Sequence, residues 1–291
     1  MSKISKKTQI NDNGLCFVIG DTDYMAVATL ALSNSIKVLY PNATIKYTSK
    51  LIDNSYSTAS TSRKNATPFS LLRAFIPTFN DFTNFDYVIY QDCDQLLLKR
   101  IDDELQAMSQ LGIGFAKCKF VFPSDQSSVL IWNLANFDRF NYLETLKRVD
   151  VKQHVDRLIL ELGVKTMLPD TLNHLDWVDE TTKIFHCTYM PSQPWNKPKL
   201  PISRWYWKYV FYELNLLNDT YFLEVLKNSI EKGTVSAELL DDYTYLREQS
   251  IRHPSIFIPP YYLYHPKLRL FVNIFRKIGQ FFCLRKENNG R

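Results

Sequence analysis

The stretch FDYVIYQDCDQLLLKRI, from Phe85 to Ile101, decides the fold of this chain. Its first half is rich in aromatic and β-branched residues and has no Gly or Pro, which is typical of a buried strand. Asp92 and Asp94 follow, separated only by Cys93. Because residues i and i+2 of an extended segment point to the same side, we expect both carboxylates to face one point just past the strand.

Two carboxylates this close repel each other unless a cation lies between them. Mg²⁺ and Mn²⁺ prefer oxygen ligands, and they suit carboxylates together with phosphate oxygens. The D-x-D pattern alone is a weak motif, however, and a polar turn after a strand explains it equally well, because Asp is common in turns. The rest of the chain favours the metal site.

The composition indicates one large or two small domains with a sizeable core, since 45% of the 291 residues are hydrophobic and 14% are aromatic. The five cysteines are scattered, odd in number and without C-x-x-C spacing. This argues against a disulfide framework and a zinc cluster, and it indicates a reducing compartment. The start carries lysines but no apolar run, and no apolar stretch reaches the roughly 20 residues of a membrane-spanning helix. We therefore expect a cytoplasmic protein.

The net charge of +5 is concentrated at one end of the chain. Residues 267–291 contain seven Lys or Arg and one Glu, so this tail carries +6 and the remainder −1. A basic body surface of the kind that binds nucleic acid is therefore not expected.

The opening of the chain has the pattern of a parallel α/β sheet. A short apolar run at 15–19 predicts a strand, the cluster at 20–24 predicts a turn, and a helix at 25–39 leads to a second strand from Thr44. Ligands on such sheets bind beyond the carboxyl ends of the strands. Asp21 and Tyr24 are thus expected at the same edge as the D-x-D, although a helix N-cap for Asp21 and ordinary packing for Tyr24 are simpler alternatives.

The middle of the chain alternates helices and strands. Residues 54–65 read as a Ser/Thr-rich loop, and PFSLLRAF from Pro68 predicts a helix that carries Arg73, either as a solvated charge or as a phosphate ligand. Further elements are expected as a helix at 102–108, strands near Gly112 and Ser127, and helices at 136–148 and 151–162, the second ended by Gly163.

A late strand-like segment, KIFHCTY from Lys183, carries His186 and leads into the Pro-rich loop MPSQPW. Imidazole is a common ligand of Mn²⁺-type ions, so His186 is a candidate third ligand beside Asp92 and Asp94. A single His is more often a structural residue, and no periodicity argument brings it near Asp94.

In their order along the chain, four landmarks resemble the GT-A glycosyltransferases, most closely the retaining family 8 that includes glycogenin and bacterial galactosyltransferases. They are the D-T-D-Y-M turn, the helical FSLLRAF, the strand ending in D-C-D, and the late His followed by P-W. The resemblance covers about Leu15 to Trp195. It implies a GT-A fold, Rossmann-like with a mostly parallel central sheet flanked by helices.

The resemblance also implies the roles of individual residues. Asp92 and Asp94 match the motif that binds the metal (Mn²⁺ or Mg²⁺) and the ribose, and His186 matches the third protein ligand. Asp21 and Tyr24 match the region that holds the nucleotide base. Arg73 matches a residue that contacts the diphosphate or sugar of the donor.

This chain also departs from the family pattern. The family's H-x-x-G-x-x-K-P-W is one residue longer here, and Gln193 holds the place of the diphosphate-binding Lys, which indicates a divergent branch with a Q-P-W motif. Lys197 and Lys199 are candidates to supply the missing charge. A retaining transfer needs a group near the anomeric carbon, and the candidates that the resemblance leaves are Gln126, Gln153 and Asp156.

We therefore expect a catalytic nucleotide-sugar-binding domain at 1–200 and a helical extension at 201–291 that meets the acceptor or a membrane. The expected activity is metal-dependent transfer of a sugar from a nucleotide donor, a UDP-sugar, to a glycan, polysaccharide or glycolipid acceptor with retention. The alternatives are a nucleotidyltransferase, which also uses paired Asp and Mg²⁺, and a glycan- or nucleotide-sugar-binding protein with weakened turnover. The aromatic run RWYWKYVFYEL in the extension suits either the core or sugar stacking.

The basic tail has an amphipathic pattern. Between Leu268 and Phe282 the apolar residues fall at steps of three and four, and basic residues lie toward the other side of a helical wheel. A helix of this kind either lies in an anionic membrane interface or packs on the core of the domain, and the pattern favours neither. The first alternative places the protein peripherally on the inner face of a membrane.

Overall fold

The computed structural model describes residues 10–51, 68–118, 127–149, 155–176, 178–188, 193–198 and 201–239. Several expectations lie outside these residues, namely the loop at 54–65, Lys199, the amphipathic tail, and two of the candidates for the anomeric centre, Gln126 and Gln153.

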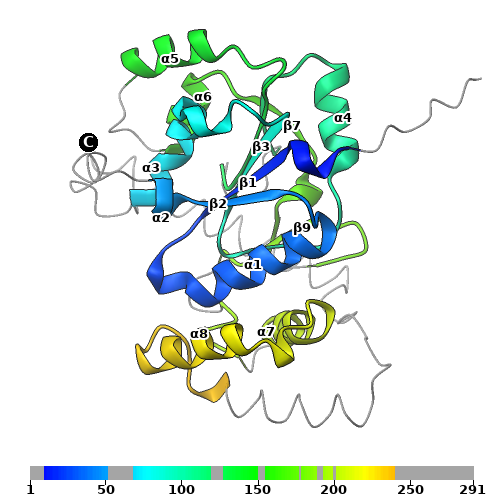
Figure 1. Cartoon of the computed structure of the whole chain (residues 1–291), viewed down its shortest axis with the longest axis vertical. Coiled ribbons are helices and arrows are strands. Elements are labelled where there is room, and N and C mark those ends of the chain that lie inside the picture. The colour runs from blue at the N-terminus through cyan, green and yellow to red at the C-terminus, as the bar shows by residue number, and fades with distance from the viewer. Residues whose placement is uncertain are drawn as a thin grey trace, which may run out of the picture.

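A central sheet of six strands organises the fold, in the order β2-β1-β3-β6-β5-β7. Neighbouring strands are parallel except where β6 runs antiparallel to β3 and β5. The expected mixed α/β fold with a mostly parallel sheet is therefore confirmed (Figure 1). The strands are β1 Leu15–Gly20, β2 Thr44–Tyr47, β3 Tyr87–Asp92, β5 Phe115–Cys118, β6 Val129–Asn133 and β7 Lys165–Leu168.

Helices cover both faces of the sheet because successive side chains of a strand alternate between its faces. From β1, Phe17 joins one cluster with residues of α1 and α4, whereas Val18 joins another with residues of α3, α5 and α6. Every residue of β1 is consequently buried, as its unbroken apolar sequence requires. The helices are α1 Ala26–Leu39, α3 Pro68–Phe75, α4 Asp102–Gln110, α5 Arg139–Arg148 and α6 Val155–Glu161.

Helix and strand boundaries differ from the expected ones by a few residues. Helix α5 begins at Arg139 rather than at 136, because the Asp138 side chain accepts a hydrogen bond from the backbone N–H of Asn141 and caps the helix there. Helix α6 ends at Glu161. Gly163 follows with φ of 81°, the left-handed conformation that glycine adopts after a helix.

A second, smaller sheet in the order β4-β9-β8 lies beyond the end of β3. Strand β4, Gln95–Leu97, runs antiparallel to β9, Ile184–His186, and β8, His174–Leu175, runs parallel to β9. The sequence patterns indicated β9 but neither β4 nor β8. This sheet places the region around residue 186 directly beside the segment that follows the D-x-D.

Residues 201–239 pack on the side of α1 that faces away from the central sheet (Figure 1). They form α7 Pro201–Lys208, a π-helical turn Tyr209–Glu213, and α8 Thr220–Glu231. The aromatic run of this segment is core: Trp205, Tyr206 and Trp207 are buried together with residues of α1 and β9. The description of this run as core is therefore correct for those residues.

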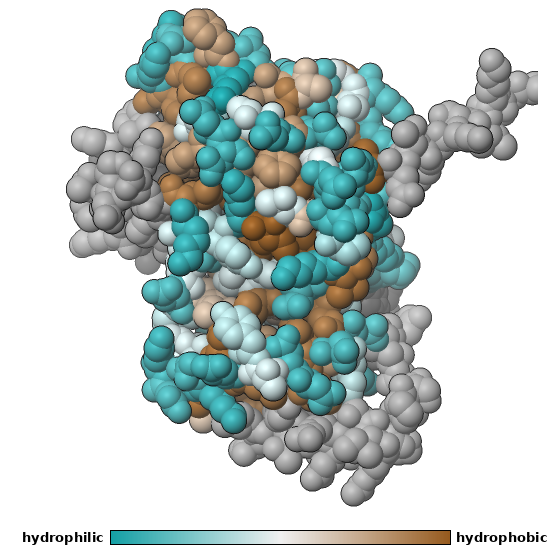
Figure 2. Space-filling view, viewed as in Figure 1, coloured by the Kyte–Doolittle hydropathy of each residue, from teal (hydrophilic) through white to brown (hydrophobic). Residues whose placement is uncertain are grey.

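The surface drawn in Figure 2 mixes hydrophilic and hydrophobic residues, with the hydrophobic ones in several separate groups. Large exposed hydrophobic side chains are likewise dispersed among different elements, for example Phe140 at the start of α5 and Tyr221 on α8. Among the described residues, no helix combines the length and apolar character that crossing a membrane requires.

Candidate metal and nucleotide site

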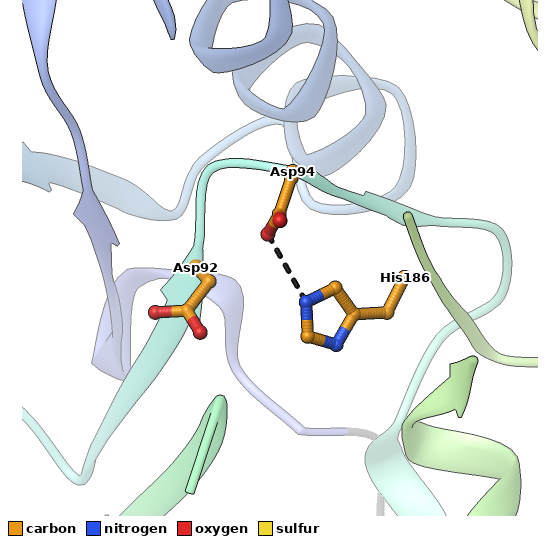
Figure 3. A group of neighbouring side chains, drawn as sticks. All are labelled: Asp92, Asp94 and His186. Carbon is orange, nitrogen blue, oxygen red and sulfur yellow. Dashed lines mark ion pairs between the residues drawn. The ribbon is translucent and has the colours of Figure 1, made fainter. Parts of the chain in front are cut away.

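The two carboxylates of the D-x-D lie at a turn between two strands. Strand β3 ends at Asp92 and β4 begins at Gln95, so Cys93 and Asp94 form the connection. The strand thus stops at the first carboxylate, as expected, and Asp94 lies in a turn rather than in an extended continuation of the strand. The turn nevertheless leaves both side chains on the same side of the sheet edge (Figure 3).

His186 completes a cluster with these two aspartates. Its strand, β9, pairs with β4 so that Gln95 and His186 are register partners, which places the imidazole next to Asp94. The distance from His186 Nε2 to Asp94 Oδ1 is 3.1 Å (Figure 3). One potential ligand atom from each of Asp92, Asp94 and His186 lies within 4.8 Å of the others.

Asp92 is held by two donors that approach the same oxygen. Tyr90 donates its hydroxyl to Asp92 Oδ1 at 2.6 Å, and Arg73 Nη2 donates to that oxygen at 3.0 Å. Tyr90 and Asp92 are two residues apart on β3 and share a face of the sheet, which explains their contact. The second oxygen of Asp92 is therefore the one that remains for a ligand.

Arg73 is buried rather than solvated, with 6% of the residue exposed. Its Nη1 donates to Ser127 O at 2.7 Å, and its guanidinium carbon lies 5.0 Å from the centre of the Tyr90 ring. The Ser127 N–H in turn donates to Asp156 Oδ1 at 2.8 Å. Burial alone would lower the pKa of Arg73, but the negative charge of Asp92 raises it, so the guanidinium stays charged.

The imidazole of His186 has an acceptor on each side. Nδ1 lies 2.8 Å from Asn173 Oδ1, while Nε2 faces Asp94. Because the amide oxygen only accepts, Nδ1 carries a proton, and the neutral ring presents its lone pair at Nε2. Burial alone would lower the pKa of His186, but the adjacent Asp94 carboxylate raises it overall.

The donor set fits a divalent cation. Two carboxylates and one imidazole are ligands that Mn²⁺ accepts, and Mg²⁺ takes the same carboxylates. Burial raises the pKa of Asp92 and the neighbouring Asp94 raises it further, against the lowering effect of Arg73, so this pair of acids lacks part of the positive charge that it needs. Polar atoms without a hydrogen-bond partner among the described residues also border the cluster: Asn173 Nδ2 and Gln193 Oε1.

Gln193 contacts the same cluster from the Q-P-W segment. Its Nε2 lies 3.3 Å from Asp94 Oδ2 and 2.9 Å from Cys187 O. Lys197, one of the two lysines proposed to replace the missing charge, donates its backbone N–H to Gln193 O.

Asp21 and Tyr24 follow β1 at the same edge of the sheet. The Asp21 carboxylate accepts the backbone N–H of Ser49 at 2.8 Å and its hydroxyl at 2.6 Å, so it holds the start of the short helix α2, Thr48–Leu51, and not α1. Its charge also raises the pKa of Cys93, after burial and the two aspartates of the D-x-D. Tyr24 is 52% exposed, so its ring is available to a ligand rather than packed.

The sequence patterns did not indicate Tyr90, Ser127, Ser128 or Asn173, which hold the cluster in place. Tyr90 had a usable signal, because it lies two residues before Asp92 on the same strand. Asn173 comes next to His186 because β8, which follows it, pairs with β9. A strand of two residues is too short to be predicted from a sequence pattern.

Comparison with solved structures relates this fold to glycosyltransferases. WbbM, a bifunctional glycosyltransferase, matches with a TM-score of 0.52 at 17% identity over 76% of this chain. The chain spans about half of WbbM, 52% of its length. No protein-family model and no curated protein matches the chain.

Two further solved structures have lower TM-scores. LgtC, a galactosyltransferase in complex with donor and acceptor sugar analogs, gives 0.43 at 13% identity over 77% of this chain and 96% of LgtC. The glycosyltransferase GlyE of Streptococcus pneumoniae gives 0.46 at 15% identity over 76% of this chain and 64% of GlyE. The α/β fold that the resemblance implied is shared with the glycosyltransferase WbbM, whose TM-score of 0.52 carries this comparison.

Proposed function

We propose that this chain is a metal-dependent glycosyltransferase that moves a sugar from a nucleotide donor, a UDP-sugar, to a glycan, polysaccharide or glycolipid acceptor with retention. The observation that carries the proposal is the convergence of Asp92, Asp94 and His186 within 4.8 Å at the end of β3, in a fold shared with glycosyltransferases. The family 8 assignment rests on the ordered landmarks of the sequence.

The three side chains would hold Mn²⁺ or Mg²⁺. When bound, such an ion stabilises the negative charge that develops on the departing nucleoside diphosphate. The protein's own contribution is a fixed set of ligands. Arg73 and Tyr90 hold one oxygen of Asp92, and Asn173 fixes the orientation of the His186 ring, so the site needs little rearrangement to accept the ion.

Asp21 and Tyr24 are proposed to bind the nucleoside. The exposed ring of Tyr24 offers a surface for stacking a base, and holding the base in this way would orient the rest of the donor. Asp156, at the start of α6, is tied through Ser127 to Arg73 and so belongs to the network around Asp92. It is the candidate near the anomeric carbon that the described residues include.

A thermal-shift experiment tests the proposal. UDP is expected to raise the melting temperature more in the presence of Mn²⁺ than with a chelator, because the ion links the diphosphate to the protein. Asp94→Ala is expected to abolish that difference. Equal stabilisation by UDP with and without chelator would contradict the metal site.

A panel of nucleotide sugars, tested with Mn²⁺, separates the alternatives. A glycosyltransferase is expected to be stabilised by particular UDP-sugars and to release UDP when an acceptor glycan is present. A nucleotidyltransferase would instead respond to nucleoside triphosphates and release pyrophosphate. Binding of a nucleotide sugar without release of UDP would indicate a binding protein with weakened turnover.

A further inference from the structure

Gln193 is buried against the carboxylate of Asp94, with 1% of the residue exposed. The Asp94 oxygen that it contacts, Oδ2 at 3.3 Å, is not the oxygen that faces His186. Its amide nitrogen also donates to Cys187 O at 2.9 Å. The side chain therefore joins the D-x-D turn to the residue that follows His186.

The orientation of this amide follows from its neighbours. A carboxylate at neutral pH and a backbone carbonyl are acceptors only, so the NH₂ group must face Asp94 and Cys187. Rotating the amide by half a turn would place its oxygen against both acceptors. In this orientation Oε1 has no hydrogen-bond partner among the described residues.

The backbone around Gln193 is fixed to the core. Its carbonyl accepts the N–H groups of Asn196 at 2.9 Å and Lys197 at 3.0 Å, which closes a turn. Trp207 Nε1 donates to Pro194 O at 3.0 Å, and the Trp195 side chain is buried in the cluster that α1 and α7 share. A side chain that leaves such an anchored turn has little freedom to move away from Asp94.

We infer that Gln193 is a positioning residue that holds Asp94 for the cation, an inference that rests on the proposed function. Oδ1 of Asp94 and Nε2 of His186 are the atoms that face each other, and both would turn to a shared ion. The contact of Gln193 with Oδ2 is compatible with that arrangement and would fix the rotation of the carboxylate. Partners of this kind orient the groups that bind a metal.

The two aspartates are then held by groups of different charge. Asp92 is paired with the guanidinium of Arg73, which already balances its charge, whereas Asp94 is held by the neutral amide of Gln193 and by His186, whose ring must be neutral to bind the ion. The negative charge of Asp94 is consequently left for the cation to balance. Cation affinity is therefore expected to depend on Gln193 both for the position and for the charge of Asp94.

Titration of the full chain with Mn²⁺ alone, by calorimetry, tests the inference. Gln193→Met keeps the length of the side chain and loses the donor, and Gln193→Asn keeps the amide but withdraws it by one carbon. Each is expected to bind Mn²⁺ about 10- to 100-fold more weakly than the wild type. Circular dichroism without metal establishes whether each variant is folded. If one of the two does not fold, the Mn²⁺ affinity of the other tests the inference.

Gln91→Met is the matched control. Gln91 is a fully buried amide whose Nε2 donates to Gln95 Oε1, and no hydrogen bond joins it to Asp94 among the described residues. Its replacement is expected to leave Mn²⁺ affinity within about threefold of the wild type. An equal loss in the Gln91 and Gln193 variants would mean that any buried amide lost near the turn has this effect, and it would overturn the inference.

Gln193→Lys separates position from charge. The ammonium keeps a donor on Asp94 but balances its charge, as Arg73 does for Asp92, so Mn²⁺ binding is expected to fall at least as far as in Gln193→Met. Wild-type affinity in all Gln193 variants, with Mn²⁺ binding lost in Asp94→Ala, would overturn the inference and leave the proposed function standing. No Mn²⁺ binding by the wild type would overturn both.

Discussion

Oδ1 of Asp94 and Nε2 of His186 lie 3.1 Å apart, close enough for both atoms to bind one cation. The other ring nitrogen of His186 lies 2.8 Å from the amide oxygen of Asn173, so the imidazole has an acceptor on both sides. Both acceptors favour the doubly protonated ring. The raised pKa of His186, which the Asp94 charge produces in spite of burial, follows from this arrangement.

We predict that Mn²⁺ affinity falls steeply on acidification through the neutral range. The ion needs the neutral ring of His186, and a pKa above the ordinary 6.5 keeps the ring protonated to a higher pH than an isolated His. The free energy of unfolding of the metal-free protein is expected to change in the opposite direction with pH. The protonated ring of His186 stabilises the folded state below pH 6.5, and this contribution is lost as the pH rises through the higher pKa of the folded state. Calorimetric titration at about pH 6, 7 and 8 measures the first effect.

His174→Gln serves as the control for this pH dependence. His174 is also buried, but its Nδ1 contacts the hydroxyl of Thr182, at 2.7 Å, and His174 is not one of the three proposed ligands. The variant is expected to keep the pH dependence of Mn²⁺ binding. An affinity that stays constant across this range in the wild type would show that His186 does not contribute its ring to the ion.

Arg73→Met is predicted to destabilise the folded protein by about 3 kcal/mol, because it leaves the largely buried Asp92 carboxylate without its cation. Urea denaturation at neutral pH measures the change. Arg157→Met is the control: Arg157 pairs with Glu161 on the exposed surface of α6, and its loss is expected to cost no more than about 0.5 kcal/mol. Equal effects of the two substitutions would show that the Arg73–Asp92 pair contributes no more than a surface pair.

Gly20→Ala is predicted to displace Tyr90. A Cβ at residue 20 would lie 2.2 Å from the Tyr90 hydroxyl, and the Tyr90 ring is fully buried, so the ring cannot simply swing away. Overpacking of this kind costs about 1–3 kcal/mol. Since Tyr90→Phe removes the clashing hydroxyl, the double variant is expected to be less destabilised than the sum of the single ones by about 1 kcal/mol. Additive free energies of unfolding would contradict the contact.

The sequence was sufficient to predict the elements with a strong period or an unbroken apolar run. Patterns that span five or more residues predict strands β1 and β3 and the helix at 26–39. They also predict that Asp92 lies at the end of a strand, at the edge of the sheet. Elements of two or three residues, β4 and β8, carry no such pattern. Strand β4 is stabilised by pairing with β9, about ninety residues further along the chain, and β8 by pairing with β9 about eleven residues further on, and no local pattern predicts either pairing.

This difference explains which parts of the site were foreseen. The proximity of Asp92 and Asp94 is local, whereas the placement of His186 came from the family resemblance and depends on the pairing of β4 with β9. Arg73 shows the opposite case. The helical pattern correctly placed it on α3, yet its burial against Asp92 depends on how α3 packs against the sheet, so the solvated charge is wrong and the contact with a donor phosphate stays a prediction.

Transfer with retention of anomeric configuration is predicted from the resemblance to family 8 alone. An α-linked UDP-sugar is expected to give an α-linked product, because retention keeps the configuration of the donor. Such a transfer needs a protein group near the anomeric carbon, as a nucleophile or to stabilise the positive charge that develops there. The coupling constant of the anomeric proton in the NMR spectrum of the product decides it. A β-linked product would assign the chain to an inverting family of the same fold.

The amphipathic pattern at 268–282 lies outside the described residues and stays a prediction from the sequence. An apolar face rich in Phe and a polar face with Arg and Lys are typical of a helix in a membrane interface. Each basic residue near an anionic surface contributes about 1 kcal/mol, so part of the +6 charge of the tail suffices for measurable binding. A protein at such a surface would be suited to a lipid-linked glycan acceptor.

Co-sedimentation with anionic liposomes tests the role of this tail. The full chain is expected to pellet with vesicles that contain phosphatidylserine at low salt and to be released at high salt, because screening weakens the attraction between surface charges. A chain that ends at Pro266 is expected to stay folded and unbound, and neutral vesicles should bind neither form. If the shortened chain unfolds and the full chain ignores anionic liposomes, the apolar face of the tail packs on the protein itself and the membrane proposal is wrong.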